Sequence, residues 1–336
     1  MPESRTARVS ATEINPSNRA LVSLARAQSY RQGEVRDAVL QSLAPFGGPG
    51  VLASPGETVL LKPNLVTYPS ENRPSCTHPE VVLAIARLVR EIGGRPVIGD
   101  SPALGSLQGV ATKTGLAEAA RAEGIPLQTL SGIRVMKVTL SGEVFHLPVA
   151  AEAVKADAII NLPKFKAHRQ ATLTFGVKNL YGCVPSKRKA FRHFASGGDL
   201  DWFCNMLVAN AVALRPRFTL VDGIVGMEGQ GPTRGNPRPL NVLVGGTDVT
   251  AVDSTCCRIV DYPPLGLSTI KAARRLGVGV WDPDRIDLAG EPLETLVVRD
   301  FQFAREIPIF FSLPQLLKSC LRSFREMLAP DPSGPR

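Results

Sequence analysis

Cysteine is scarce in this sequence, and the few cysteines are scattered. The chain has 336 residues and six cysteines, none of them in a C-x-x-C pair. Iron–sulfur clusters and structural zinc sites draw their ligands from closely spaced cysteines and histidines. The spacing therefore predicts no iron–sulfur cluster in this chain. It favours free thiols in a reducing cytoplasm over a disulfide framework.

Long apolar runs are also missing. The sequence has no uninterrupted apolar run of about 18 residues, the length that a membrane-spanning helix needs. Residues 1–8 are polar and lack the apolar core of an export signal. We therefore expect a cytoplasmic protein without a spanning helix.

Two nucleotide-binding motifs and a stacking surface are absent as well. The sequence contains neither G-x-x-x-x-G-K-[ST] nor a dinucleotide fingerprint of the form G-x-G-x-x-G, so nucleotide hydrolysis is not indicated. Aromatic residues make up 6% of the chain and do not interleave with its lysines. Nucleic acid is therefore not an expected partner.

The residues that are present predict an α/β fold with a mostly parallel sheet flanked by helices. Residues 57–62 and 96–100 are expected strands, and residues 77–93 between them have helical spacing with Thr77 as the N-cap. A strand, a helix and a strand of these lengths form a unit that places its two strands in parallel.

Three parts are expected along the chain. They are a flexible arm (1–19), an α/β domain (20–298) that is one unit or two lobes (about 20–150 and 151–298), and a tail (299–336). Within the tail, residues 314–328 carry their apolar side chains on one helical face and basic ones elsewhere. Such an amphipathic helix docks on its own protein or a second subunit, or lies peripherally on an anionic membrane surface.

Positive charge is concentrated in one segment. Residues 155–193 hold nine lysines and arginines against one acid, Asp157, in a chain whose formal net charge is +9. Residues 158–162 indicate a strand buried on both faces, and a cationic loop is expected after Pro163. This concentration favours a pocket for an anion, the alternative being a solvated loop of surface lysines.

Four expected strand ends should bring polar residues together, because the carboxyl ends of parallel strands lie at the same edge of a sheet. These ends are Lys62–Asn64, Asp100–Ser101, Lys164–His168 and Asp222–Gly223. We expect His168, Lys178 and Asp222 to be catalytic, with His168 moving a proton because imidazole titrates near neutral pH. The residues expected to bind the substrate are Lys62, Asn64, Lys164, Lys166, Asn179, Gly229 and Gly231.

A glycine-rich segment over residues 222–235 is expected to be a loop that approaches a ligand closely. Its two carboxylates, Asp222 and Glu228, could bind a divalent cation. The alternative is a flexible turn whose carboxylates pair with Arg234 and nearby lysines.

Seven ordered motifs, within about residues 20–290, resemble the family named domain of unknown function 362. They are Val59–Leu65, Thr77–Val82, Ile159–His168, Gly176–Gly182, Val221–Ile224, Met227–Pro232 and Asp248–Asp253. The family has no generally assigned reaction, so the resemblance implies none. Many members carry a fused ferredoxin-like module, whose cysteine motifs this chain lacks.

A more distant resemblance is to the nickel-pincer lactate racemases. His168 precedes Lys178 by ten residues, which is the spacing of a histidine and the cofactor-holding lysine in those enzymes, and Lys62–Pro63 stands where they have Arg-Pro. Their second proton-transferring histidine has no clear match here.

The sequence thus favours an enzyme that acts on a small carboxylate- or phosphate-bearing metabolite by proton transfer, as an isomerase or racemase does, with a divalent metal as one option. One alternative is a non-catalytic protein that binds an anionic membrane or nucleic acid through its basic segment and tail. Another is a redox protein related to the ferredoxin-fused members. A homo-oligomer is compatible with all three.

Overall fold

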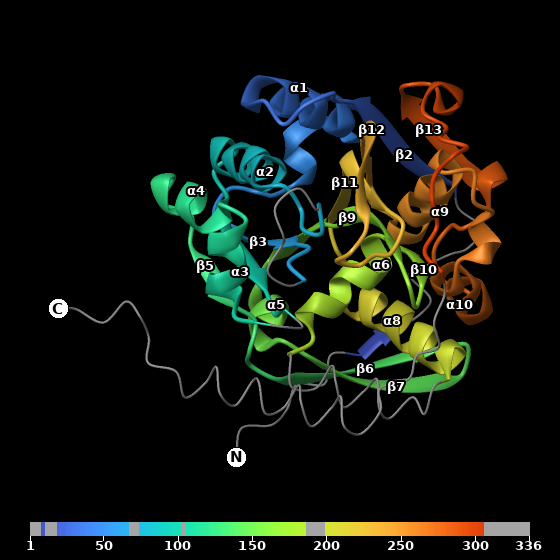
Figure 1. Cartoon of the computed structure of the whole chain (residues 1–336). Helices are drawn as coiled ribbons and strands as arrows, with labels where there is room; N and C mark the ends of the chain where they lie inside the picture. Colours follow the sequence, from blue (N-terminus) through green and yellow to red (C-terminus); the bar gives the residue numbers. More distant parts are fainter. Residues whose placement is uncertain (1–7, 11–18, 67–73, 103–104, 186–198, 306–336) are drawn as a thin grey trace, which may run out of the picture.

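The computed structural model describes residues 8–10, 19–66, 74–102, 105–185 and 199–305 (Figure 1). The expected amphipathic helix at 314–328 lies outside these residues, as does most of the expected N-terminal arm. Residues 8–10 of that arm form strand β1 (Arg8–Ser10), which pairs in parallel with β6 (Arg134–Leu140). Strands β1, β6 and β7 (Glu143–Val149) together make a small second sheet.

The main sheet has ten strands within the described residues, and eight of them follow one path. In order across the sheet, these are β13 (Ile286–Gly290), β2 (Ala20–Arg26), β12 (Asn236–Gly246), β11 (Phe218–Glu228), β8 (Ala158–Leu162), β3 (Thr58–Pro63), β4 (Arg95–Asp100) and β5 (Leu127–Thr129). Along this path only β12 runs against its neighbours. The prediction of a mostly parallel α/β sheet is therefore confirmed. Strands from both sides of residue 150 belong to this sheet, so the two expected lobes share it.

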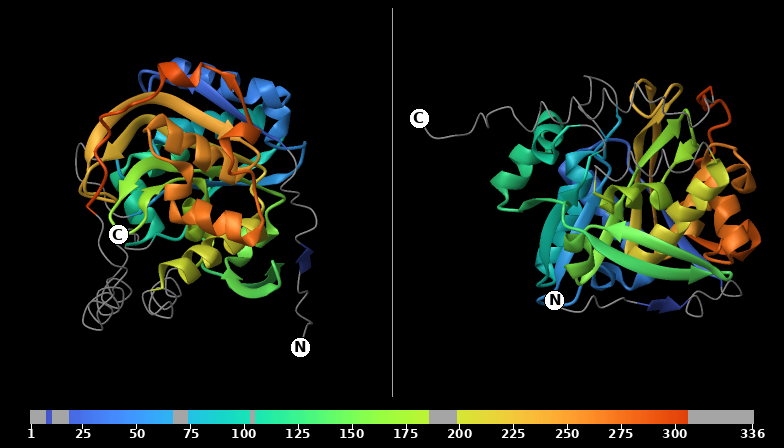
Figure 2. Two further views of the ribbon diagram at one scale, coloured as in Figure 1. Left: turned by 90° about the vertical axis from the view of Figure 1, so that its right-hand side faces the viewer. Right: turned by 90° about the horizontal axis from the view of Figure 1, so that it is seen from below.

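Two layers cover the sheet (Figures 1 and 2). One layer contains α1 (Gln32–Leu43), α2 (Pro79–Glu91), α3 (Leu107–Lys113) and α4 (Leu116–Ala122). The other contains α5 (Ala151–Lys155), α8 (Leu200–Leu214), α9 (Val249–Ile259), α10 (Ser268–Leu276) and the β6–β7 hairpin. Alternation along β3 explains this arrangement, since Leu61 packs in the first layer and its neighbour Leu60 in the second.

Strand β9 (Lys164–His168) replaces the irregular loop that was expected after Pro163. It pairs in parallel with β11 and antiparallel with β10 (Thr172–Thr174). All five residues of β9 are buried, so the loop prediction was wrong in both conformation and exposure. Pairing with β11 satisfies backbone groups that a loop would have left to water.

Two other local predictions are corrected. The glycine-rich segment begins as strand, because β11 continues to Glu228 and pairs with β12 along most of its length. Helix α2 starts one residue later than expected, with His78 as its N-cap: the His78 Nδ1 atom accepts a hydrogen bond from the Glu80 amide. The Thr77 hydroxyl instead donates to the Leu162 carbonyl at 2.6 Å, which ties the start of α2 to the end of β8.

Candidate functional site

Strand β9 places its polar residues on one face. Side chains alternate along a strand, so Lys164, Lys166 and His168 share a side while Phe165 and Ala167 face the hydrophobic core. The antiparallel register puts Thr174 opposite Lys166 and Thr172 opposite His168. The β9–β10 hairpin thus carries two lysines, a histidine and two threonines on one face.

Lys164 is held in a buried network with Asp222 and Tyr30. Its Nζ lies 2.7 Å from Asp222 Oδ2 and 2.8 Å from the Tyr30 hydroxyl, which in turn donates to Asp222 Oδ1 at 2.8 Å. The His78 amide also donates to Asp222, and the His78 ring stacks on Tyr30 with centroids 3.7 Å apart. Burial lowers the pKa of Lys164, against the opposing attraction of Asp222. Burial also lowers the pKa of His78, to about 4, so that ring is neutral at physiological pH.

A second buried ion pair joins β3 to β4. Lys62 Nζ lies 3.0 Å from Asp100 Oδ1, and the same carboxylate accepts the amides of Ser101 and Leu65. Gly182 packs directly over this pair: a Cβ atom there would lie 2.3 Å from Lys62 Nζ. Lys62, expected to bind the anion, therefore supports the strand ends instead and does not line the pocket.

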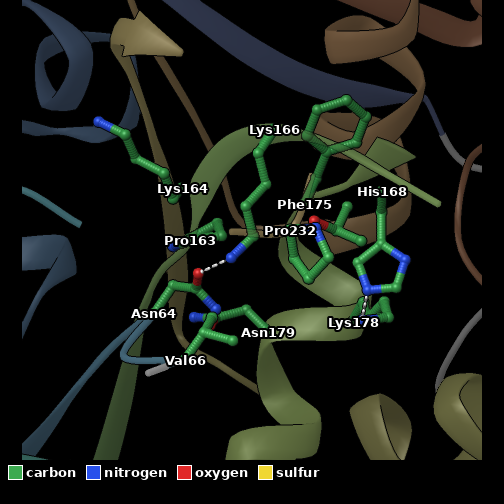
Figure 3. Close-up of a pocket in the computed structure, with 11 residues that line it drawn as sticks. Asn64, Val66, Pro163, Lys164, Lys166, His168, Phe175, Lys178, Asn179 and Pro232 are labelled. Atoms are coloured by element: carbon green, nitrogen blue, oxygen red, sulfur yellow. Dashed lines mark hydrogen bonds between the residues drawn. The ribbon is translucent and has the colours of Figure 1, made fainter. Parts of the chain in front are cut away.

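A pocket opens beside these pairs (Figure 3). Its lining consists of Asn64, Val66, Pro163, Lys164, Lys166, His168, Thr174, Phe175, Lys178, Asn179 and Pro232. The enclosed space together with its mouth measures about 330 Å³. The part of it that the centre of a water molecule can reach measures about 60 Å³, so the pocket suits a ligand of a few non-hydrogen atoms.

Lys166 extends into the pocket, whereas Lys164 turns away from it (Figure 3). The Lys166 ammonium donates to Asn64 Oδ1 and, at 2.9 Å, to the Ser75 carbonyl. Asn64 is oriented by Asn179, whose Oδ1 accepts from Asn64 Nδ2 at 3.0 Å. Asn179 also donates to the Lys62 carbonyl and to Asn161 Oδ1, so a chain of amides fixes this wall.

Lys178 and His168 form the opposite wall. Lys178 Nζ lies 3.2 Å from His168 Nε2, and His168 Nδ1 accepts the Gln170 amide at 3.1 Å. A neutral ring that accepts at Nδ1 carries its proton on Nε2, and only an uncharged amine can accept that proton. This form of the contact therefore needs the uncharged amine of Lys178. The lowering of its pKa to about 8 by burial acts in the same direction.

Helix α6 (Gly176–Asn179) carries both Lys178 and Asn179. Asp253 of α9 anchors its first turn, accepting the Gly176 amide at 2.7 Å and the Val177 amide at 3.1 Å. Burial raises the pKa of Asp253 to about 7, although these two hydrogen bonds oppose the shift. A buried carboxyl on the core side thus positions the lysine on the pocket side.

The positive charge of the pocket is only partly neutralised. Asp222 and Asp100 pair with Lys164 and Lys62, but neither Lys166 nor Lys178 contacts a carboxylate of the described residues. Burial, reinforced by the neighbouring lysines, lowers the pKa of Lys166 to about 7. A bound anion would supply the missing negative charge and stabilise both ammonium forms.

Several residues expected at the site lie elsewhere. Glu228 lies six residues beyond Asp222 on β11, past an irregularity in the pairing with β9 and β12. It accepts the Gln302 amide, while both Asp222 oxygens are taken by Lys164, Tyr30 and His78. The two carboxylates therefore do not form the joint metal site that the sequence suggested. Gly229 and Gly231 do not line the pocket either, although their neighbour Pro232 does.

The histidines and other possible metal ligands near the pocket bear on the resemblance to the racemases and on the expected metal site. His168 is the sole histidine among the pocket-lining residues that the structure describes, so a second proton-transferring histidine is not assembled here. No group of three or more metal-ligating side chains gathers in the described ranges. The described pocket thus brings together the histidine and the lysine of the racemase-like spacing but supplies no second histidine.

The sequence alone does not reveal three important side chains. Tyr30 was not singled out because it lies in the loop before α1, 134 residues from Lys164. His78 lies within the Thr77–Val82 motif, but its contact with Tyr30 has no sequence signal, and Thr174 stands two residues before the Gly176–Gly182 motif. Their positions depend on how distant segments meet, which local spacing does not encode.

Residues 59–258 match the family described as domain of unknown function (DUF362). The chain is 42% identical over 304 residues to the thylakoid-associated protein sll1697 of Synechocystis sp., which covers 90% of this chain and 94% of that protein. Among solved structures, it is similar to the lactate racemase apoprotein from Thermoanaerobacterium thermosaccharolyticum, with 14% identity and a TM-score of 0.43. That match covers 72% of this chain and 56% of the racemase.

Replacing Lys164 by alanine should strongly destabilise the fold, because it leaves Asp222 buried without its cation. We expect a loss of about 3–5 kcal/mol in the free energy of unfolding, measured by denaturant titration. The double variant Lys164→Met/Asp222→Leu should recover much of this loss. Arg19→Ala, which breaks an exposed ion pair with Asp287, is the control and should change little. A tolerated Lys164→Ala would contradict the account of the network.

Anion affinity should fall as the pH rises. Lys166 and Lys178 have pKa values of about 7 and 8 without ligand, and an anion binds their protonated forms. Sulfate keeps its charge across this range, so its affinity by calorimetry should weaken at least about tenfold from pH 6.5 to 9. Lys166→Met and Lys178→Met should each weaken binding and flatten the profile. An affinity independent of pH would rule out titrating lysines as the anion ligands.

Proposed function

The chain belongs to the domain of unknown function 362 family, and we propose that it is an enzyme that binds a small carboxylate- or phosphate-bearing anion and transfers a proton on it. The proposal rests chiefly on the contact between Lys178 and His168 inside a pocket that also holds the unneutralised Lys166. A binding protein for anions needs the lysines but has no need of a paired base.

The anion is assigned to the Lys166 side of the pocket. Lys166 lacks a carboxylate partner among the described residues, and Asn64 and Asn179 hold its amine at the wall. A carboxylate or phosphate oxygen there would accept from the ammonium and from the Asn64 amide group. Because these donors are already oriented, little ordering is needed on binding.

Proton transfer is assigned to His168 and Lys178. An amine with a pKa of about 8 that faces an imidazole can take up or release a proton near neutral pH. The Gln170 amide fixes the ring orientation, and Asp253 fixes α6, so both groups keep their positions while the proton moves. A carbon-bound hydrogen of the substrate next to the anionic group is the expected site of reaction.

Asp222, expected to be catalytic, receives a different role. Both of its oxygens are engaged by Lys164, Tyr30 and the His78 amide, so it does not face the pocket. We assign it to positioning β9 through Lys164.

Hydrogen–deuterium exchange tests the proposal without a known product. Small carboxylates and phosphate esters would be incubated with the protein in D₂O, and loss of a carbon-bound proton would be followed by NMR. We expect exchange in at least one compound, slowed about 100-fold or more in His168→Asn and in Lys178→Met. His146→Asn, at an exposed position of β7, is the matched control and should behave as wild type.

If an exchanging compound is found and both pocket variants exchange it at the wild-type rate, the assigned roles are wrong. If no compound exchanges although anions bind, the site is one of binding and not of proton transfer.

A second candidate function is peripheral association with an anionic membrane surface. The relative of 42% identity is named as thylakoid-associated, and residues 314–328 of this chain have an amphipathic, basic pattern. Among the described residues, no helix has both the length and the apolar character to cross a membrane. The proposal is of contact with the membrane surface through the tail.

Liposome co-sedimentation tests this second candidate. The full-length chain should sediment with vesicles that contain anionic lipid, and less so as salt increases. Replacing Lys318, Arg322 and Arg325 together by glutamine should abolish sedimentation, whereas Lys113→Gln, Arg121→Gln and Lys271→Gln together should not. Equal sedimentation of both triple variants would contradict binding through the tail.

A further inference from the structure

Thr174 is a pocket residue that the proposed mechanism does not use. It is the last residue of β10, and its register partner across the hairpin is Lys166. Its side chain lines the pocket and is 5% exposed. Directly opposed residues of an antiparallel pair have Cβ atoms about 5 Å apart, so Thr174 stands beside the lysine that we assign to the anion.

The Thr174 hydroxyl has no hydrogen-bond partner within the part of the chain that the structure describes. Buried hydroxyl groups are nearly always paired, because an unpaired one forfeits its bonds to water. Other buried threonines here follow that rule: Thr77 donates to the Leu162 carbonyl and Thr255 to the Ala251 carbonyl. Thr174 Oγ1 is an exception at the place where a ligand would lie.

We propose that Thr174 hydrogen-bonds a second oxygen of the substrate, so that the pocket selects a small carboxylate bearing a hydroxyl or oxo group beside its charged end. This inference rests on the proposed anion site at Lys166. With the charged end at Lys166, the neighbouring threonine reaches an atom one or two bonds further along the ligand. An unsubstituted acid would leave the hydroxyl unpaired, and that loss is the basis of selection.

Thr174 would also help to orient the ligand for reaction. Lys166 and Thr174 would hold two oxygens of the ligand on the β9–β10 side, and His168 also belongs to the polar face of that hairpin. The carbon between the two oxygens would then be oriented toward the His168–Lys178 pair. Thr174 is in this scheme a specificity residue rather than a proton carrier.

Two matched pairs of acids test the inference: acetate with glycolate, and propanoate with 3-hydroxypropanoate. Calorimetry on the full-length protein should show that at least one hydroxy acid binds about tenfold more tightly than its unsubstituted partner. Thr174→Val keeps the shape but removes the hydroxyl, so it should abolish this preference while acetate affinity stays within about twofold. Thr174→Ser should retain the preference, and Thr139→Val, at an exposed position of β6, should leave it unchanged.

The outcomes separate this inference from the function on which it rests. If the wild type binds acid and hydroxy acid equally in both pairs, or if Thr174→Val keeps the preference, the inference is overturned. In that case, loss of acetate binding in Lys166→Met would still support the anion site at Lys166. If none of the four acids binds to the wild type, the anion site and the role of Thr174 fall together.

Discussion

The desolvation of lysine ammonium groups is the constraint on which this site depends. Lys62, Lys164 and Lys166 are buried around the strand ends and Lys178 is half-buried, so water contributes little to stabilising their charge. Two are neutralised internally, Lys62 by Asp100 and Lys164 by Asp222, and these pairs join neighbouring strands. Lys166 and Lys178 contact only neutral partners within the described residues, so the preference of these two amines for the charged form is weakened.

The sequence predicted the part of the site that follows from sheet topology. Parallel strands end at a common edge, so Lys62–Asn64 and Asp100 could be expected to meet the residues after β8, and they do. The concentration of charge near Lys178 indicated the positive charge of the pocket, and the short spacing from His168 reflects a real contact. The strand boundaries followed from runs of apolar residues such as 158–162, which need no knowledge of distant partners.

What the sequence did not reveal depends on tertiary pairing. Pro163 and the lysines after it suggested a loop, yet K-F-K-A-H already alternates polar and apolar side chains, which is the pattern of a strand with one face in a core. Asp222 and Glu228 looked like neighbours because the glycines between them suggested a turn. The extension of β11 separates them instead. Tyr30 could not be found locally, because its role is defined by Asp222, 192 residues away.

Strand β11 pairs with two successive strands on the same side, first with β8 through residues 218–219 and then with β9 from Asp222 onward. The β9–β10 hairpin is thus a branch of the sheet and not one of the strands that define its order. Residues on β10 can change without disturbing the pairing of β3, β8 and β11. A substitution on β10 therefore alters the pocket wall at Thr174 while the strands that carry Lys62 and Asp222 keep their pairing.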